Sequence, residues 1–290
     1  MKLTIGCAQL TSGDDQGTNL NAAERAIHEL AERGARLIML PEHFPFIGPD
    51  HLRQKYAEPL ASAFWLPRIR ELCRRLDVYV HIGSFLERCE RRIHNTGVVV
   101  DPDGDIISVY RKIHLFDVEI PGGLTYRESA VITAGSEVVT FAIDDFIFGM
   151  TTCYDLRFPE LFRRLTARGA TVLLVPAAFT LQTGRDHWEV LLRARAIENL
   201  CWVAAAGQWG AAPPQHLLYG RSMIVNPWGL VVAQAPDGSG GDYRRPRPAG
   251  PAGYPHQIPG PESPSSGSVF GWLNCYQRQI DDEHYSRRRQ

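Results

Sequence analysis

The sequence predicts an α/β fold built from two similar halves. Amphipathic helical segments alternate with short apolar, β-prone segments along most of the 290 residues, which is the pattern of strands joined by helices. Residues 32–41 (ERGARLIMLP) resemble residues 167–176 (ARGATVLLVP), and residues 99–104 resemble residues 224–229 in the same order. This repeat favours two packed half-units, with two facing sheets and the helices outside. Chance similarity between helix–glycine–strand and hairpin sequences is the alternative.

In the first half, strands and helices are expected to alternate and to end in a hairpin. The expected elements are a strand at residues 3–8, a polar loop at 12–19, a helix at 21–33, a strand at 37–40, a helix at 66–76, a strand at 78–83, and hairpin strands at 97–100 and 106–110. The helices are predicted from apolar residues that share one face, such as Ala23, Ile27 and Leu30. Gly34 is a natural C-terminal stop, and residues 101–104 (DPDG) have the composition of a type I turn.

The second half is expected to repeat this order and then lose its regular pattern. The expected elements are a strand at residues 146–150, a helix that opens near Phe158, a strand at 171–175, a helix at 186–200, a strand at 201–206, and hairpin strands at 222–225 and 230–233. Pro159 suits the first turn of its helix because the missing amide proton is not needed there. Residues 238–267 are rich in Gly, Pro and Ser. We therefore predict a domain at residues 1–237 and a disordered tail at 238–290.

Composition and charge narrow the class of protein. Hydrophobic residues make up 44% and charged residues 22% of the chain, and the net charge is −1, so nothing steers the protein toward nucleic acid or an acidic membrane surface. The six cysteines are scattered without any C-x-x-C pair, which argues against a disulfide framework and against a thiolate metal site. No leader and no long apolar span is evident. We expect a cytosolic protein without a metal or a cofactor.

Cys153 occupies a position suited to a nucleophile. It follows the apolar run at residues 146–150 and precedes the helix that opens near Phe158. The free amide groups and the dipole at a helix N-terminus favour an anion, and a thiolate is the anion that cysteine can supply. The alternative is that Cys153 is a small buried hydrophobic residue, as free cysteines usually are.

Glu42 and Lys112 could complete a catalytic set with Cys153. Glu42 follows an apolar strand, at the strand end where α/β sheets place their sites, and Lys112 ends a hairpin strand. A thiol needs a base to become an attacking thiolate, a carboxylate can be that base, and a fixed ammonium can stabilise the oxyanion that forms. The alternatives are a glutamate that merely begins a loop and an ordinary surface lysine.

Three segments together resemble the signature segments of the carbon–nitrogen hydrolase (nitrilase) superfamily. They are residues 40–42 (LPE), 110–116 (YRKIHLF) and 153–160 (CYDLRFPE), in the order and spacing of that superfamily. The resemblance covers about residues 2–237. It implies a four-layer αββα sandwich, an amidase reaction through a thioester, and no cofactor.

The resemblance also implies a role for each residue of the set. Glu42 would be the general base, Lys112 the oxyanion stabiliser and Cys153 the nucleophile. The amide of Tyr154 would be the second oxyanion donor. Glu128 matches the second glutamate motif of the family and would orient Lys112 and the leaving group.

Within the superfamily the chain is similar to the deaminated glutathione amidases. Phe179, Thr180 and residues 187–198 carry this similarity, whereas the related omega-amidases usually have Asn in place of Thr180. The implied substrate is a small carboxylated 2-oxo acid amide. Arg157 matches a position that binds a substrate carboxylate in relatives, and an Arg can clamp a carboxylate through two hydrogen bonds. The alternative for Arg157 is an ion pair with a helix residue such as Glu160.

Other readings of the sequence stay open. Omega-amidase action on 2-oxoglutaramate is one alternative, and a non-catalytic family member that acts as a binding scaffold is another. Arg221 stands where relatives commonly have His, in a strand expected to border the substrate pocket. Relatives also pack a C-terminal segment at a dimer interface, where this chain has its Gly- and Pro-rich tail. A homodimer is therefore possible but not implied.

Overall fold

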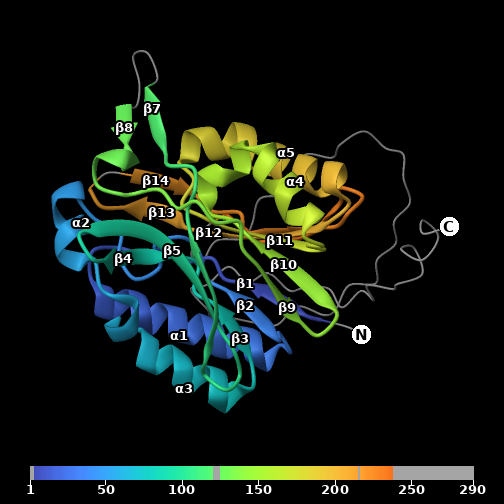
Figure 1. Cartoon of the computed structure of the whole chain (residues 1–290), viewed down its shortest axis with the longest axis horizontal. Helices are drawn as coiled ribbons and strands as arrows, with labels where there is room; N and C mark the ends of the chain where they lie inside the picture. Colours follow the sequence, from blue (N-terminus) through green and yellow to red (C-terminus); the bar gives the residue numbers. More distant parts are fainter. Residues whose placement is uncertain (1–2, 120–124, 215, 238–290) are drawn as a thin grey trace.

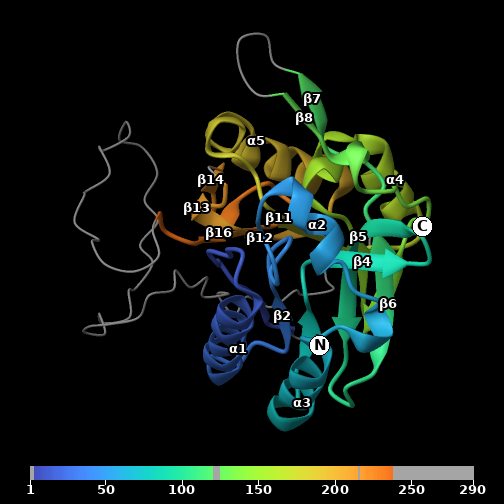
Figure 2. The ribbon, with the colours of Figure 1, turned by 90° about the vertical axis from the view of Figure 1, so that its left-hand side faces the viewer.

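The chain folds into a four-layer αββα sandwich. The computed structural model describes residues 3–119, 125–214 and 216–237, so the predicted tail at 238–290 lies outside the described residues. Helices α1 (Gln16–Glu32) and α3 (Leu66–Leu76) form one outer layer, and α4 (Pro159–Ala167) and α5 (Leu181–Asn199) form the other (Figure 1). A quarter turn shows the two sheets between the helix layers (Figure 2). The expected sandwich is confirmed.

The first sheet combines three parallel strands with an antiparallel hairpin. Its path has the order β1 (Ile5–Cys7), β2 (Leu37–Met39), β3 (Tyr79–His81), β5 (Arg92–Val100) and β4 (Phe85–Cys89), with β6 (Ile106–Arg111) paired to β5. Strands β1, β2 and β3 are parallel, and β5 is antiparallel to β3, β4 and β6.

The second sheet repeats this plan. Its order is β16 (Val231–Gln234), β15 (Met223–Val225), β12 (Trp202–Gly207), β11 (Val172–Ala177), β10 (Phe146–Met150) and β9 (Thr140–Ile143). Strands β10, β11 and β12 are parallel, β9 is antiparallel to β10, β15 is antiparallel to β12, and β16 is antiparallel to β15. Helices α4 and α5 follow β10 and β11, as α1 and α3 follow β1 and β2. The internal repeat in the sequence therefore corresponds to two structural half-units.

Alternating side chains of the inner strands build three apolar layers. In β2, Leu37 and Met39 pack between the two sheets, whereas Ile38 packs against α1 and α3. In β11, Leu174 packs between the sheets and Leu173 packs under α4 and α5. Both faces of these strands are buried, which explains why they are continuously apolar in the sequence.

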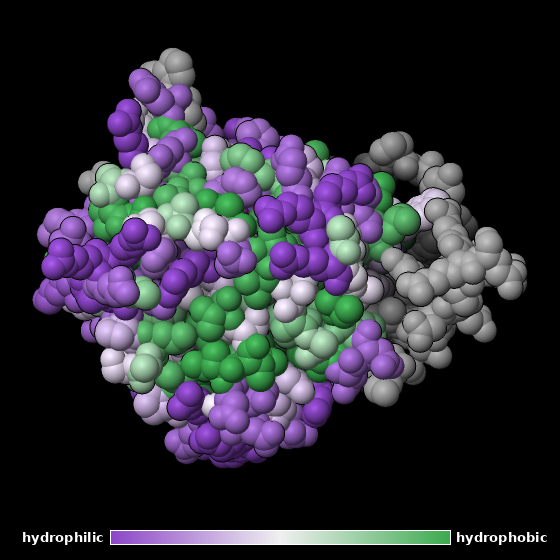
Figure 3. Space-filling view, viewed as in Figure 1, coloured by the Kyte–Doolittle hydropathy of each residue, from purple (hydrophilic) through white to green (hydrophobic). Residues whose placement is uncertain are grey.

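Several short elements gather at one end of the sandwich, on the left in Figure 1. They are α2 (Asp50–Tyr56), η1 (Leu60–Ser62), the hairpin β7 (Asp117–Glu119) and β8 (Thr125–Arg127), η2 (Glu128–Ala130), η3 (Cys153–Arg157), and the hairpin β13 (Trp209–Ala212) and β14 (His216–Tyr219). On the broad face that Figure 1 presents, hydrophobic residues gather across the middle, and hydrophilic residues cover the lower and left edges (Figure 3). None of the helices in the described ranges has the length and apolar character needed to cross a membrane.

Two helices begin earlier than the sequence pattern predicted. Residues 12–19 were expected to form a loop, but α1 begins at Gln16, because Asp15 caps it by accepting a hydrogen bond from the Thr18 amide at 2.6 Å. Helix α5 begins at Leu181 rather than at residue 186, with Thr180 as its cap. The first turns of both helices are mostly polar, so apolar periodicity did not reveal them.

Candidate active site

Lys112 bridges two buried carboxylates at the end of the sandwich where the short elements gather. Its Nζ lies 3.1 Å from Oε1 of Glu42 and 2.9 Å from Oε2 of Glu128, and all three side chains are almost fully buried. Glu42 follows β2, Lys112 follows β6 and Glu128 begins η2. Burial alone would lower the pKa of Lys112, but the carboxylates of Glu128 and Glu42 raise it well above its usual value. Lys112 is therefore an ammonium.

Further hydrogen bonds hold the two carboxylates in place. Nδ2 of Asn95, in β5, donates to Oε1 of Glu42 at 2.8 Å and to Oε1 of Glu128 at 3.1 Å. The Ala178 amide donates to Oε2 of Glu42 at 2.9 Å, and the Phe116 amide donates to Oε2 of Glu128 at 2.7 Å. Burial would raise the pKa of Glu42, but the Lys112 ammonium, His43 and the Cys153 side chain hold it at about 2. Both carboxylates are ready to accept, not to donate, a proton.

Cys153 opens the short helix η3 directly after β10. The Cys153 thiol lies against the Glu42 carboxylate, and its residue is only 9% exposed. Burial and the negative charge of Glu42 raise the pKa of the thiol well above its usual value, although Lys112 lowers it. The position of Cys153 differs from the prediction in one respect: η3 separates it from α4, which begins only at Pro159. In this buried position the thiol needs a base to become a thiolate.

The buried carboxylate of Asp155 joins the turn at Cys153 to the segment around Lys112. Oδ2 of Asp155 accepts hydrogen bonds from the Thr152 amide at 2.8 Å and from the Tyr110 hydroxyl at 2.6 Å. Oδ1 of Asp155 lies 3.0 Å from the His114 amide and 2.7 Å from Nδ1 of His114. Asp155 is fully buried, so these four contacts satisfy a carboxylate that water cannot reach.

Asn95 and Asp155 were not singled out from the sequence. Asparagine is disfavoured in strands, and Asn95 lies in the polar first half of β5, between His94 and Thr96. It precedes the strand predicted at residues 97–100, so no local pattern marked it. Asp155 lay inside a motif that we had already quoted, but its role in joining two segments required the tertiary contacts.

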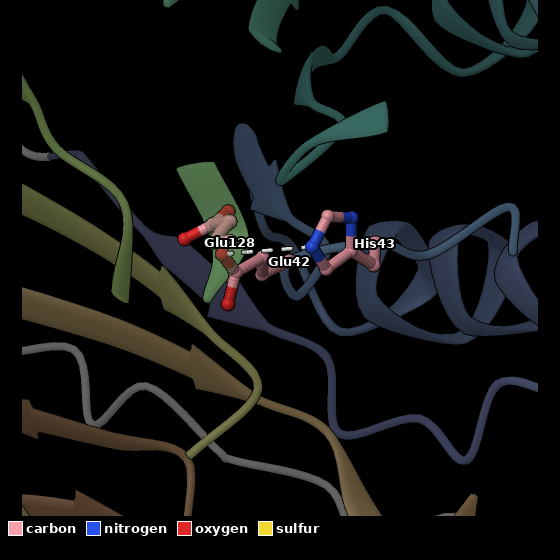
Figure 4. A group of neighbouring side chains, drawn as sticks. All are labelled: Glu42, His43 and Glu128. Carbon is pink, nitrogen blue, oxygen red and sulfur yellow. Dashed lines mark ion pairs between the residues drawn. The ribbon is translucent and has the colours of Figure 1, made fainter. Parts of the chain in front are cut away.

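Glu42, His43 and Glu128 lie close enough to hold a cation. Their ligand atoms are all within 4.8 Å of one another, and the His43 ring faces Glu42 with Nε2 3.8 Å from Oε1 (Figure 4). Burial lowers the pKa of His43 to about 4, so it is neutral near pH 7. The Lys112 ammonium already bridges the two carboxylates and supplies the positive charge that a metal ion would otherwise bring.

The catalytic cluster opens into a pocket with aromatic and cationic walls. Its lining residues include Ile47, Arg53, Phe116, Tyr126, Tyr154, Arg157, Phe179, Thr180, Thr183, His216 and Leu218. Each residue that the sequence singled out as catalytic or substrate-binding lines this one pocket. Arg53, Tyr126 and His216 were not expected as lining residues, because they come from short elements that the sequence pattern did not reveal.

Arg157 lies over two aromatic rings of the pocket. Its guanidinium carbon is 5.4 Å from the centre of the Phe179 ring and 5.7 Å from the centre of the Tyr154 ring. Both terminal nitrogens lie 3.3 Å from Nδ1 of His187. His187, which belongs to α5, is therefore the helix residue that Arg157 contacts, in place of the expected Glu160.

Thr180 and Arg221 differ in their relation to the pocket. Thr180 lines it and also caps α5, with its Oγ1 2.8 Å from Oγ1 of Thr183. Arg221 does not line it: its Nη2 lies 2.5 Å from Oδ2 of Asp237, and its guanidinium packs over the Tyr219 ring. The expected strand does border the pocket through His216 and Leu218 of β14, but the ion pair with Asp237 directs the Arg221 side chain elsewhere.

A protein-family model and curated proteins both relate this chain to carbon–nitrogen hydrolases. A family model described as carbon–nitrogen hydrolase matches residues 4–241. The deaminated glutathione amidase of Synechocystis sp. strain PCC 6803 is 40% identical over 232 residues, which is 78% of this chain and 85% of the relative. The deaminated glutathione amidase of Homo sapiens is 40% identical over 246 residues, which is 81% of this chain and 74% of the relative.

Solved structures with the same architecture include three proteins. Caenorhabditis elegans NitFhit superposes with a TM-score of 0.72 at 38% identity, over 82% of this chain and 59% of that chain. Saccharomyces cerevisiae Nit3, of the nitrilase superfamily, gives 0.73 at 28% identity, over 81% and 86%. An amidase from Nesterenkonia sp. AN1, with acrylamide added at its active-site cysteine, gives 0.70 at 26% identity, over 80% and 88%.

Proposed function

The chain belongs to the carbon–nitrogen hydrolase family, and from this premise we propose that it hydrolyses deaminated glutathione to 2-oxoglutarate and cysteinylglycine. It is a hydrolase of carbon–nitrogen bonds other than peptide bonds. The observation that carries the proposal is the Cys153 thiol held against the ionised Glu42, with the Lys112 ammonium beside them. Thr180, one of the residues in which the sequence resembles the deaminated glutathione amidases, lines the pocket.

The first half of the reaction forms a thioester on Cys153. As Sγ attacks the amide carbon, Glu42 takes the thiol proton, so no free thiolate has to form in the buried site. The negative charge that develops on the carbonyl oxygen is stabilised by the Lys112 ammonium and by the Tyr154 amide. Glu42 then passes the proton to the amide nitrogen, the carbon–nitrogen bond breaks, and cysteinylglycine leaves as a neutral amine.

The second half uses water in the same geometry. Glu42 takes a proton from a water molecule, whose oxygen attacks the thioester carbon. The new tetrahedral oxyanion meets the same two donors, and its collapse returns the proton to Cys153 and releases 2-oxoglutarate. Glu128 contributes by holding Lys112 at 2.9 Å, so the ammonium keeps its position as charge moves onto and off the substrate oxygen.

Arg157 is the proposed partner of the 2-oxo acid carboxylate. It follows Cys153 within the same short helix η3, and its guanidinium faces the pocket over the Phe179 and Tyr154 rings. The ring stacking holds the guanidinium plane, and two parallel N–H donors match a carboxylate. The aromatic rings beside it can pack against the two methylene groups of the 2-oxo acid.

We predict that Arg157→Ala raises KM for 2-oxo acid amides far more than for uncharged amides. A charge-assisted hydrogen bond is worth about 1.5–3 kcal/mol, so KM for the charged substrates should rise by about 10-fold or more. Steady-state kinetics on matched charged and uncharged amides measure the difference. The matched control is Arg185→Ala, which removes an exposed arginine of α5 that does not line this pocket. Equal loss on both kinds of substrate would make Arg157 a structural residue.

A substrate panel on the purified full-length chain tests the proposed function. The expected result is a higher kcat/KM for deaminated glutathione than for 2-oxoglutaramate. The reverse order would make the protein an omega-amidase. A non-catalytic scaffold would hydrolyse neither substrate. Substrate would also not slow the labelling of its Cys153 by iodoacetamide.

Location and assembly extend the proposal. The five cysteines in the described part of the chain are all free, which suits the reducing cytoplasm that we propose. We also propose that two copies of the chain can form a homodimer. Size-exclusion chromatography with light scattering on the full-length chain measures the assembly directly.

A further inference from the structure

A second arginine, Arg53, lines the same pocket from the opposite half of the fold. Arg53 belongs to α2, between β2 and α3, whereas Arg157 belongs to η3 after β10. Its side chain is only 14% exposed, although α2 itself has no buried residue. One arginine is enough for the carboxylate of a 2-oxo acid, so a second arginine in the same pocket can bind a second anionic group.

The two arginines lie at the two ends of a row of aromatic rings. The Arg157 guanidinium is 5.7 Å from the Tyr154 ring, and the Tyr154 and Phe116 rings are 5.1 Å apart. The Phe116 and Tyr126 rings are 5.8 Å apart, and the Arg53 guanidinium is 5.5 Å from the Tyr126 ring. All five residues line the pocket. A ligand that extends along this row meets a positive charge at each end.

The positive charge of Arg53 acts on the interior of the pocket. It contributes, after burial, to the lowered pKa values of His43 and His216, which both line the pocket. The acidic partner of Arg53 is Asp50, whose Oδ1 lies 3.0 Å from Nε and whose side chain is 59% exposed. Such a solvated pair within one short helix is weak. A guanidinium has five N–H donors, so Arg53 can bind a second carboxylate.

We propose that Arg53 binds the glycine carboxylate of the cysteinylglycine portion, and so selects amides whose leaving group is a carboxylated peptide. The inference rests on the proposed function. Deaminated glutathione carries a carboxylate at each end, with the scissile amide between them. Arg157 shares η3 with Cys153 and takes the shorter, 2-oxo acid arm, which leaves the longer peptide arm for Arg53. In 2-oxoglutaramate the leaving group is ammonia, so Arg53 has no partner in that substrate.

The test is Arg53→Gln in the full-length chain, with both substrates. KM for deaminated glutathione should rise by about 10-fold, the effect of one lost charge-assisted hydrogen bond, while kcat changes little and KM for 2-oxoglutaramate is unchanged. Deaminated glutathione whose glycine carboxylate is amidated should have the same raised KM with the unaltered chain as deaminated glutathione has with Arg53→Gln. The substitution Arg53→Gln should not raise the KM of this amidated substrate further. Lys55→Gln is the matched control, because it removes a charge from the same helix at a residue that does not line the pocket.

The outcomes separate this inference from the function on which it rests. Equal KM changes on the two substrates, or none on either, would overturn the role of Arg53 while leaving the amidase intact. An unaltered chain that does not hydrolyse deaminated glutathione would overturn both. If the thermal midpoint shows that Arg53→Gln is unfolded, Arg53→Lys keeps the charge with different geometry. Its expected KM defect is smaller and is again confined to deaminated glutathione.

Discussion

Replacing Cys153 with alanine is expected to abolish amide hydrolysis while the protein keeps its fold. The substitution removes one sulfur atom, but that atom is the proposed nucleophile, and without it no thioester can form. Removal of the nucleophile from a covalent hydrolase lowers kcat by a factor on the order of 10⁶. The measurement is the release of cysteinylglycine from deaminated glutathione by the purified full-length chain, together with its circular dichroism spectrum.

The fold should survive because other groups hold this turn. The backbone φ of residue 153 is +49°, and alanine has the same Cβ as cysteine, so the left-handed conformation costs no more than before. The hydrogen bonds of Asp155 to the Thr152 amide and to the Tyr110 hydroxyl do not involve the sulfur. Glu42 also keeps its bond from Asn95. We expect a loss of stability of about 1 kcal/mol.

Cys89→Ala is the matched control for this experiment. Cys89 ends β4 and does not line the pocket, so its removal should leave turnover unchanged. Substantial residual hydrolysis by Cys153→Ala with a native circular dichroism spectrum would show that another group attacks the amide. That result would remove Cys153 from the mechanism.

Replacing Lys112 with alanine is expected to lower kcat by about 10²–10³-fold, the usual effect of deleting one oxyanion donor. The geometry adds a second consequence, because Lys112 is also the counterion of two buried carboxylates. Without it, the described residues join Glu42 and Glu128 only through Nδ2 of Asn95. Breaking a buried ion pair in this way costs about 3–5 kcal/mol of stability, so the thermal midpoint should fall as well.

The same substitution should change the pH dependence of activity. In the unaltered chain the pKa of Glu42 is about 2, so the base stays ionised far into the acidic range. Without the ammonium of Lys112, burial and the nearby carboxylate of Glu128 raise the pKa of Glu42. Protonation then inactivates the base at higher pH. The acidic limb of the kcat/KM profile should therefore move to higher pH in Lys112→Ala.

Lys55→Ala controls for the loss of one positive charge. Lys55 lies in α2 and contacts the Tyr56 ring outside the pocket, so its removal should leave the pH profile unchanged. If Lys112→Ala changes KM alone and leaves the pH dependence of kcat/KM unchanged, Lys112 would be a binding residue instead of an oxyanion donor.

Local patterns predicted most of the sandwich but not the elements around the site. The helix Leu66–Leu76 and the strand Phe146–Met150 have the predicted bounds, because each carries its own apolar period. Helix α2 has no buried residue, and the β7–β8 hairpin has strands of three residues each. Segments of this kind have no apolar pattern to reveal them. Arg53 and Tyr126, which lie on them, were missed for that reason.

By itself, the sequence determined the two-half α/β fold, the family and the identity of the candidate triad, because periodicity and motifs are properties of neighbouring residues. Only the tertiary structure decided how these residues are charged and what they contact. Glu42 and Lys112 are 70 positions apart in the chain, yet their contact sets the pKa of both. The raised pKa of Cys153 depends on burial that no local pattern records. Arg157 faces the pocket and Arg221 turns to Asp237, because side-chain partners are chosen among segments that meet only in the folded chain.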